Sequence, residues 1–146
     1  MSLVFSSSLS AEAKLSIAAL RVELGRAEPS SLRDRLRADL DPNRLARFCV
    51  HHGIAPSVCR ALTTVADVAT VGPLRDALTP SVRACAAAGL RKAQVLTDIL
   101  RRFADSGIEA ILLKGTGLDV RFYDGPGRQN YADHDFLVRR DQLSDA

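Results

Sequence analysis

The sequence predicts an α+β fold, in which a helical N-terminal region precedes the first strands of a sheet. Two observations support this prediction. Before about residue 107, apolar side chains recur at the three- and four-residue spacing of helices, with proline and glycine at the breaks. After Gly107 the pattern changes to short apolar segments at 108–113 and 132–138, which are typical of strands. We therefore expect a helical region, 1–107, and the beginning of a second region, 108–146.

Capping residues predict the first two helices. Ser10 is a suitable N-cap for a helix that reaches Leu24, and Gly25 is a suitable stop. The Pro-Ser-Ser sequence at 29–31 interrupts the helical pattern. A short helix over 31–40 is expected after this break.

Prolines predict the starts of the later helices. Asp and Pro at 41–42 form a cap followed by proline at the first helical position, and this helix ends near His52. Pro56 begins another short helix. Thr and Pro at 79–80 repeat the cap signal and open the longest helix, which Gly107 ends. This helix carries an apolar stripe that we expect to be buried within the protein, with partner binding as the alternative: Val82, Ala86, Gly89, Ala93, Leu96, Leu100 and Phe103.

The first apolar segment after the helices leads into a glycine-containing turn. Segment 108–113 is short and mostly branched, which suits a buried strand. Gly115 and Gly117 allow the turn, and residues 116–123 suit a helix whose first amides face an anion. The alternative is an ordinary turn between a strand and a helix.

Two aspartates lie at the second apolar segment. If residues 132–138 form a strand, its two-residue period puts Asp133 and Asp135 on one face. Two carboxylates so placed suit Mg²⁺, which takes one or two protein carboxylates and fills its other positions with water and substrate phosphates. The alternative is a solvated strand face that binds nothing.

Together these residues form a pattern that resembles the nucleotidyltransferases of the DNA polymerase beta superfamily. The pattern comprises Leu-Lys-Gly at 113–115, Tyr123, Arg128 and Asp-His-Asp-Phe-Leu-Val at 133–138. It is most similar to a poorly characterised bacterial branch. The resemblance covers most of residues 40–140.

The resemblance implies a polymerase-beta-like mixed sheet and a metal-dependent reaction. A nucleoside monophosphate would pass from a nucleoside triphosphate to a hydroxyl acceptor, which in this superfamily is a protein, an RNA or a small molecule. The alternative is a non-catalytic nucleotide-binding or protein-interaction module with a degenerate nucleotidyltransferase fold. The residues implied are Asp133 and Asp135 as catalytic ligands of Mg²⁺ or Mn²⁺, and Lys114, Gly115, Thr116 and Arg128 as nucleotide contacts.

The chain departs from the superfamily pattern at three places. Thr116 stands where serine is usual, and His134 takes a hydrophobic position. The superfamily also uses a third carboxylate on a later strand, whereas Asp141 and Asp145 are the only acids after the motif. We therefore expect a truncated sheet, a site completed elsewhere, and an open strand edge that a second copy could pair with. An all-helical scaffold is a third possibility.

Composition limits the remaining classes of function. Lys and Arg number 20 against 17 Asp and Glu, giving a net charge of +3 that suits nucleotide or nucleic-acid binding, although a solvated helical surface explains it equally well. No apolar run approaches the ~20 residues of a membrane span. Cys49, Cys59 and Cys85 fit a reducing compartment, so we expect the cytoplasm. A zinc site is one interpretation of Cys49, His51, His52 and Cys59. The favoured interpretation is a thiol in the core and histidines at the end of a helix.

Overall fold

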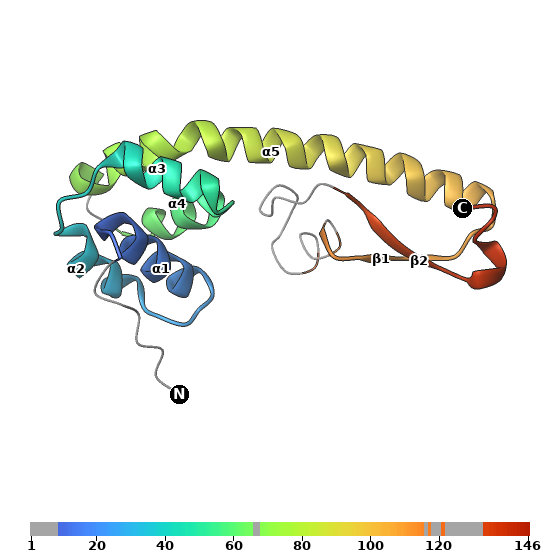
Figure 1. Cartoon of the computed structure of the whole chain (residues 1–146), viewed down its shortest axis with the longest axis horizontal. Coiled ribbons are helices and arrows are strands. Elements are labelled where there is room, and N and C mark those ends of the chain that lie inside the picture. Colours follow the sequence, from blue (N-terminus) through green and yellow to red (C-terminus); the bar gives the residue numbers. More distant parts are fainter. Residues whose placement is uncertain (1–8, 66–67, 116, 118–120, 122–132) are drawn as a thin grey trace. The chain divides into compact units, whose positions relative to one another are not determined.

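The computed structural model describes residues 9–65, 68–115, 117, 121 and 133–146. The chain divides into two compact units, Met1–Val82 and Arg83–Ala146, and the division falls inside the long helix α5. The described elements confirm the predicted α+β class, with helices first and a small antiparallel sheet after them (Figure 1). The division into a helical domain and a nucleotidyltransferase core at 107/108 stays a prediction.

The first unit is a cluster of helices around one apolar core. In it α1 packs against α3 and α4, and the N-terminal part of α5 adds buried side chains (Figure 1). The elements are α1 (Ala11–Glu23), η1 (Pro29–Leu32), α2 (Arg33–Leu36), α3 (Pro42–His51), α4 (Ala55–Thr63) and α5 (Val68–Asp105). The core includes Leu15, Ala19, Leu32, Leu45, Cys49, Val58, Leu62, Val71, Leu74 and Leu78.

Local capping determines where α1 and α3 begin. The Ser10 hydroxyl accepts a hydrogen bond from the Ala13 amide at 3.2 Å. The Asp41 carboxylate accepts from the amides of Asn43 and Arg44 at 2.8 and 3.3 Å. Each cap satisfies backbone donors that have no partner within the helix, so both predicted starts are confirmed.

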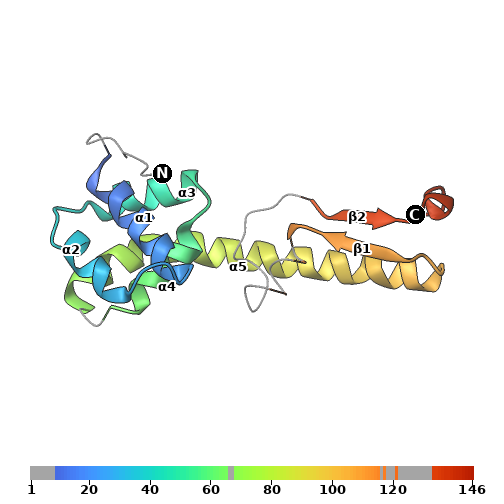
Figure 2. The same cartoon turned by 90° about the horizontal axis from the view of Figure 1, so that it is seen from below.

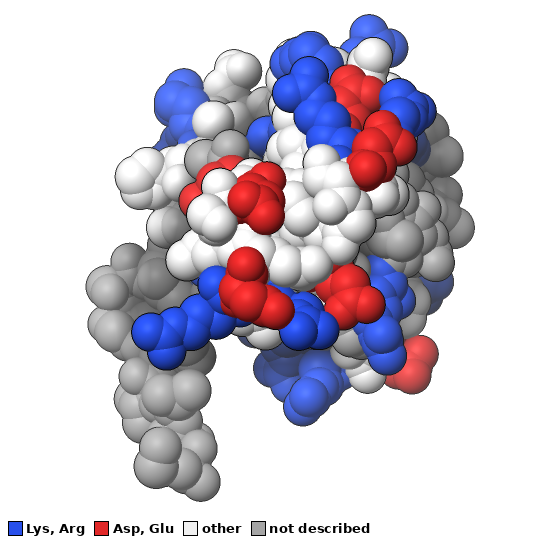
Figure 3. Space-filling view, turned by 90° about the vertical axis from the view of Figure 1, so that its right-hand side faces the viewer, with Lys and Arg blue, Asp and Glu red and all other residues white. Residues whose placement is uncertain are grey.

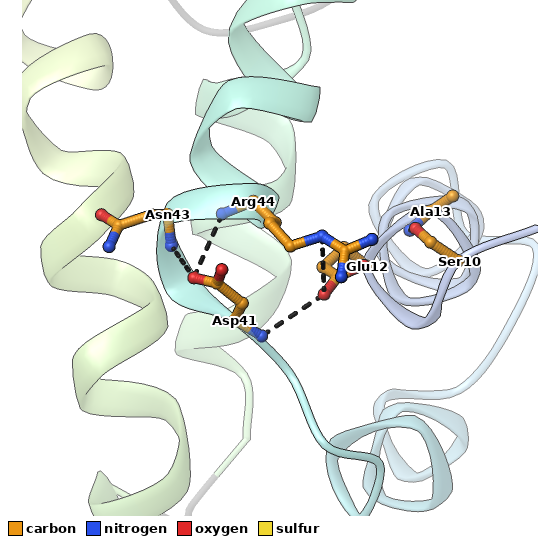
Figure 4. Close-up of polar contacts among 6 residues, drawn as sticks. All are labelled: Ser10, Glu12, Ala13, Asp41, Asn43 and Arg44. Atoms are coloured by element: carbon orange, nitrogen blue, oxygen red, sulfur yellow. Dashed lines mark hydrogen bonds and ion pairs between the residues drawn. The ribbon is translucent and has the colours of Figure 1, made fainter.

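Glu12 joins α1 to the start of α3. One of its carboxylate oxygens accepts a hydrogen bond from the Asp41 amide at 3.3 Å and lies 4.0 Å from Nε of Arg44 (Figure 4). The side chain is almost fully buried. Burial raises the pKa of this carboxyl, but hydrogen bonds from its own amide, Ser10 and Asp41 and the charge of Arg44 outweigh burial, so the pKa lies below its usual value.

The helix predicted over 31–40 is wrong in both start and length. Pro29 begins a 3₁₀ turn, and the short α-helix that follows ends at Leu36. The Ser31 hydroxyl donates to the Glu28 carbonyl at 2.6 Å, so this serine closes the turn and does not cap a helix.

The predicted start of the longest helix at Pro80 is also wrong, because α5 begins at Val68. Val71, Leu74 and Leu78 follow one another at three- and four-residue spacing and are all buried in the core of the first unit. Their burial favours a helix over the segment that leads into the proline. The Thr79 hydroxyl donates to the Arg75 carbonyl at 2.8 Å, a contact within the helix.

The second unit contains the sheet. Strands β1 (Ala110–Leu113) and β2 (Asp135–Val138) pair antiparallel, with Ala110 opposite Val138 and Leu113 opposite Asp135. Figure 2 shows the two strands side by side along the C-terminal half of α5, and the 3₁₀ turn η2 (Arg140–Gln142) follows β2. This pairing excludes the all-helical alternative.

One face of the sheet packs on α5. The ring of Phe136 makes an edge contact with Phe103 on α5, with 5.3 Å between the ring centroids. Leu96 is buried, as the predicted stripe requires, but Leu100 is exposed, and the half-buried Ile99 lies on the packed face instead. The packed face therefore contains Ile99 in place of the predicted Leu100, whereas Leu96 and Phe103 lie on it as predicted.

The two strands are shorter than predicted because each needs the other as a partner. Lys114 has a φ of +51°, which ends β1, and the two described residues directly before Asp135, at 133–134, have no opposite residue in the ladder. At the other end, Gln142 donates to the Gly107 carbonyl at 2.9 Å and accepts from the Glu109 amide at 3.2 Å. This side chain therefore pairs with backbone groups just before β1, where β2 offers no partner.

Candidate functional site

The Lys-Gly turn and the Asp-x-Asp motif meet at one end of the sheet. Leu113, the last residue of β1, is opposite Asp135, the first residue of β2. Because the strands are antiparallel, the residues after β1 and those before β2 are brought to the same end. This region contains Lys114, Gly115, Asp133 and Asp135, although Asp133 lies 18 positions after Gly115 in the sequence.

An ion pair joins the two motifs directly. The ammonium nitrogen of Lys114 lies 2.9 Å from Oδ2 of Asp135, with the lysine side chain 78% and the aspartate side chain 37% exposed. The hydrogen bond to Asp135, together with the negative charges of Asp135 and Asp133, raises the pKa of the lysine above its usual 10.5. Both carboxylates thus stabilise the positive charge of Lys114, and the space between them favours a cation.

The backbone at the turn has an uncommon conformation. Lys114 and Gly115 have φ values of +51° and +42°, in the left-handed region. A lysine there costs roughly 1–2 kcal/mol relative to the right-handed form, whereas glycine bears no such cost. The turn directs the chain away from the ladder immediately after Leu113 and leaves the Lys114 side chain beside Asp135.

Two of the predicted nucleotide contacts lie outside the described residues. Thr116 and Arg128 belong to segments that the structure does not describe, as does Tyr123 of the sequence pattern. Gly115, Gly117 and Arg121 have helical backbone, but the rest of the helix expected over 116–123 lies outside the described residues, so this helix stays a prediction. The roles of all six predicted site residues stay predictions.

His134 lies between the two aspartates in sequence and faces the other way. Its Nε2 is 3.1 Å from the Lys92 carbonyl of α5, and its ring lies near that of Phe136. Asp133 is exposed. The histidine thus packs toward the helix, on the side where the sequence pattern expects a hydrophobic residue, while the carboxylates remain accessible.

The sheet face that carries Asp135 also carries exposed apolar side chains. Ile111 is 63% exposed and pairs across the ladder with Leu137, which is exposed too. Leu113, opposite Asp135, is the third exposed apolar residue. The carboxylate therefore lies at the edge of an apolar surface, an arrangement that suits a ligand with both a charged and an apolar part.

The donor atoms fit a hard divalent cation better than they fit zinc. Carboxylate oxygens are the ligands of Mg²⁺ and Mn²⁺, and Mg²⁺ commonly takes one or two of them together with substrate phosphates. Over the described ranges, no three His, Cys, Asp or Glu side chains lie close enough to hold a metal. Cys49, considered as a zinc ligand, is a core residue whose sulfur lies 3.6 Å from the Ser16 hydroxyl. Burial raises the pKa of this thiol, which disfavours the thiolate.

Charges of both signs are intermingled on the surface. Figure 3 shows Lys and Arg side chains beside Asp and Glu side chains on one face of the molecule. Two of the ion pairs in the second unit are Arg139 with Asp141 at 2.9 Å and Arg101 with Asp98 at 3.4 Å. This distribution fits a solvated surface better than a basic track for a nucleic-acid backbone.

The ion pair between Lys114 and Asp135 is the feature of the site that sequence reasoning missed. The sequence pattern predicts separate roles for the two residues, phosphate contact for the lysine and metal binding for the aspartate. The signal that predicts their contact is antiparallel pairing of the two apolar segments, since the residue after one strand then adjoins the start of the other.

Comparison with known proteins identifies one family. The family described as uncharacterised nucleotidyltransferase matches residues 38–146, which include α3, α4, α5 and both strands. Neither a curated protein nor a solved structure matches the chain. In the part of the chain that the structure describes, no helix has an apolar stretch long enough to cross a membrane.

Proposed function

The chain belongs to the family of uncharacterised nucleotidyltransferases, and we propose that residues 114–135 carry a metal-dependent site for a nucleoside triphosphate. The observation that carries the proposal is the contact of 2.9 Å between Lys114 and Asp135, which unites the turn and the acidic motif. The resemblance to the polymerase beta superfamily and to its bacterial branch supports the same site.

In the proposed reaction an acceptor hydroxyl oxygen bonds to the α-phosphorus, the bond from that phosphorus to the bridging oxygen breaks, and pyrophosphate leaves. The hydroxyl proton passes to solvent. Asp133 and Asp135 would hold Mg²⁺ or Mn²⁺, which when bound supplies charge neutralisation of the triphosphate and activation of the hydroxyl. Lys114 and the turn at Gly115 would orient the β- and γ-phosphates, with Thr116 and Arg128 as further contacts. The acceptor is a protein, an RNA or a small molecule.

A second candidate function is a non-catalytic module that binds the nucleotide without transferring it. Two carboxylates are enough to hold a metal ion with a triphosphate, whereas catalysis depends on several groups positioned together. We place either activity in the cytoplasm because Cys49, Cys59 and Cys85 are free thiols. A second copy of the chain is a further proposed partner, through an open edge of the sheet.

Isothermal titration of the chain with a non-hydrolysable nucleoside triphosphate, with and without Mg²⁺, tests the proposed site. We expect binding that requires Mg²⁺ and that falls at least about tenfold in Asp133→Asn and Asp135→Asn, since each variant loses a metal ligand. Asp141→Asn is the matched control, because it removes the same charge from a carboxylate paired with Arg139. Binding without Mg²⁺, or equal loss in all three variants, would contradict the proposal.

A further inference from the structure

Lys114 and Asp135 differ in their freedom to move. Asp135 is a strand residue with a short side chain, and its backbone is fixed by pairing with Leu113. Lys114 has a long side chain that is 78% exposed, and only its ammonium end touches the aspartate. If one partner leaves this contact, the lysine side chain is therefore the one that moves, and the fold does not have to change.

The ammonium takes a carboxylate oxygen that the proposed function requires for a metal ion. We propose that Lys114 is the resident counter-cation of this site, which an entering divalent metal ion displaces from Asp135. This inference rests on the proposed function. The ammonium lies 2.9 Å from Oδ2, so a divalent ion that binds this carboxylate meets the repulsion of a nearby positive charge, which solvent weakens at this exposed site. Metal binding and the ion pair are therefore competitors.

The displaced ammonium has a use in the same site. Lysine carries a compact positive charge with three donors on a flexible stem, which suits a phosphate group. Since the stem begins at the turn directly after β1, the ammonium remains within a side-chain length of Asp135 after displacement. Entry of the metal thus frees the lysine for the triphosphate, and the two ligands are coupled through one side chain.

A simpler role for Lys114 makes a different prediction. If the lysine serves only as a phosphate contact, its removal weakens nucleotide binding and leaves the affinity for metal alone unchanged. If it competes with the metal, its removal strengthens the binding of metal alone. An exposed ion pair of this kind is worth a factor of about two to five. The two roles are therefore separated by titration of the metal without nucleotide.

The test is a calorimetric titration with Mn²⁺ in the absence of nucleotide. We expect Lys114→Met to bind Mn²⁺ about two- to fivefold more tightly than the wild type, and Lys114→Arg to bind no more tightly. Methionine bears the same backbone cost as lysine at positive φ, so it does not alter the turn. Arg139→Met is the matched control, because it also removes one positive charge from an exposed ion pair, here with Asp141, and we expect no tightening.

The outcomes separate this inference from the proposed function. Equal or weaker Mn²⁺ binding by Lys114→Met, with binding lost in Asp135→Asn, would overturn the displacement and leave the proposed site intact. The same tightening in Arg139→Met would also overturn it, because general charge would then explain the effect. No Mn²⁺ binding by the wild type, or binding that persists in Asp135→Asn, would overturn the displacement. The proposed function is then decided by the nucleotide titration, because its metal ion is held together with substrate phosphates.

Discussion

Glu12 and Lys114 are two charged residues with opposite surroundings. Glu12 is 4% exposed and is held by the Asp41 amide at 3.3 Å, so its charge contributes to the stability of the helical unit. Lys114 is mostly exposed, and an exposed ion pair contributes little to stability. The first charge therefore serves the fold, and the second is available to exchange partners.

The pH dependence of folding tests the role of Glu12. Its pKa is lower in the folded chain than the usual 4.5, so the ionised form stabilises the fold above about pH 4.5 and this contribution is lost as pH falls through the folded pKa. We expect Glu12→Gln to lower the free energy of unfolding by about 1–2 kcal/mol at pH 7, because a hydrogen-bonded charge is lost. Urea unfolding at several pH values measures the difference, which should shrink on acidification.

Glu28→Gln is the control for this series, since Glu28 is exposed and its substitution should change stability by less than about 0.5 kcal/mol. A difference between Glu12→Gln and the wild type that stays constant from pH 7 to below pH 4.5 would contradict the assigned role.

Sequence alone predicts the contacts that are local in the chain. The caps at Ser10 and Asp41 involve residues two or three positions away, and both were predicted. The contact from Glu12 to Asp41 spans 29 positions, and the pair of Lys114 with Asp135 spans a long intervening segment. Such contacts depend on how elements pair, which spacing along the chain does not encode.

At the scale of elements, α5 shows how tertiary packing overrides a local signal. Thr79 and Pro80 have the sequence of a helix start, yet the helix continues through them. Proline lacks the N–H that would donate to the Asp76 carbonyl, which costs stability inside a helix. The burial of Val71, Leu74 and Leu78 stabilises the part of the helix that leads into the proline. Tertiary pairing also determines the strands. Each strand ends where its partner ends, and not where its own apolar pattern ends.

Pro80→Ala tests whether the helix is continuous. If α5 passes through this position, alanine restores a hydrogen bond and we expect the free energy of unfolding to rise by about 1–3 kcal/mol. Urea unfolding followed by helical circular dichroism measures the change. Pro42→Ala is the control, because Pro42 is at the start of α3, where a missing N–H has no cost, and we expect no gain. No gain from Pro80→Ala would instead favour a helix that begins at Pro80.

At the scale of the whole molecule, the family match and the compact units have different boundaries. The match begins at residue 38, whereas the first unit includes α1 and the turn before α2. Leu15 of α1 is as fully buried as Leu45 of α3, and both belong to one core. The helices within the match therefore need α1 to close their apolar core, although α1 lies outside the match.

Leucine truncation tests this dependence. We expect Leu15→Ala to lower the free energy of unfolding by about 2–5 kcal/mol, as much as Leu45→Ala, because each removes a fully buried side chain from the same core. Leu24→Ala, at the exposed end of α1, should change it by less than about 0.5 kcal/mol. Urea unfolding followed by helical circular dichroism compares the three variants. A small effect of Leu15→Ala beside a large effect of Leu45→Ala would mean that the family-matched helices hold their core without α1.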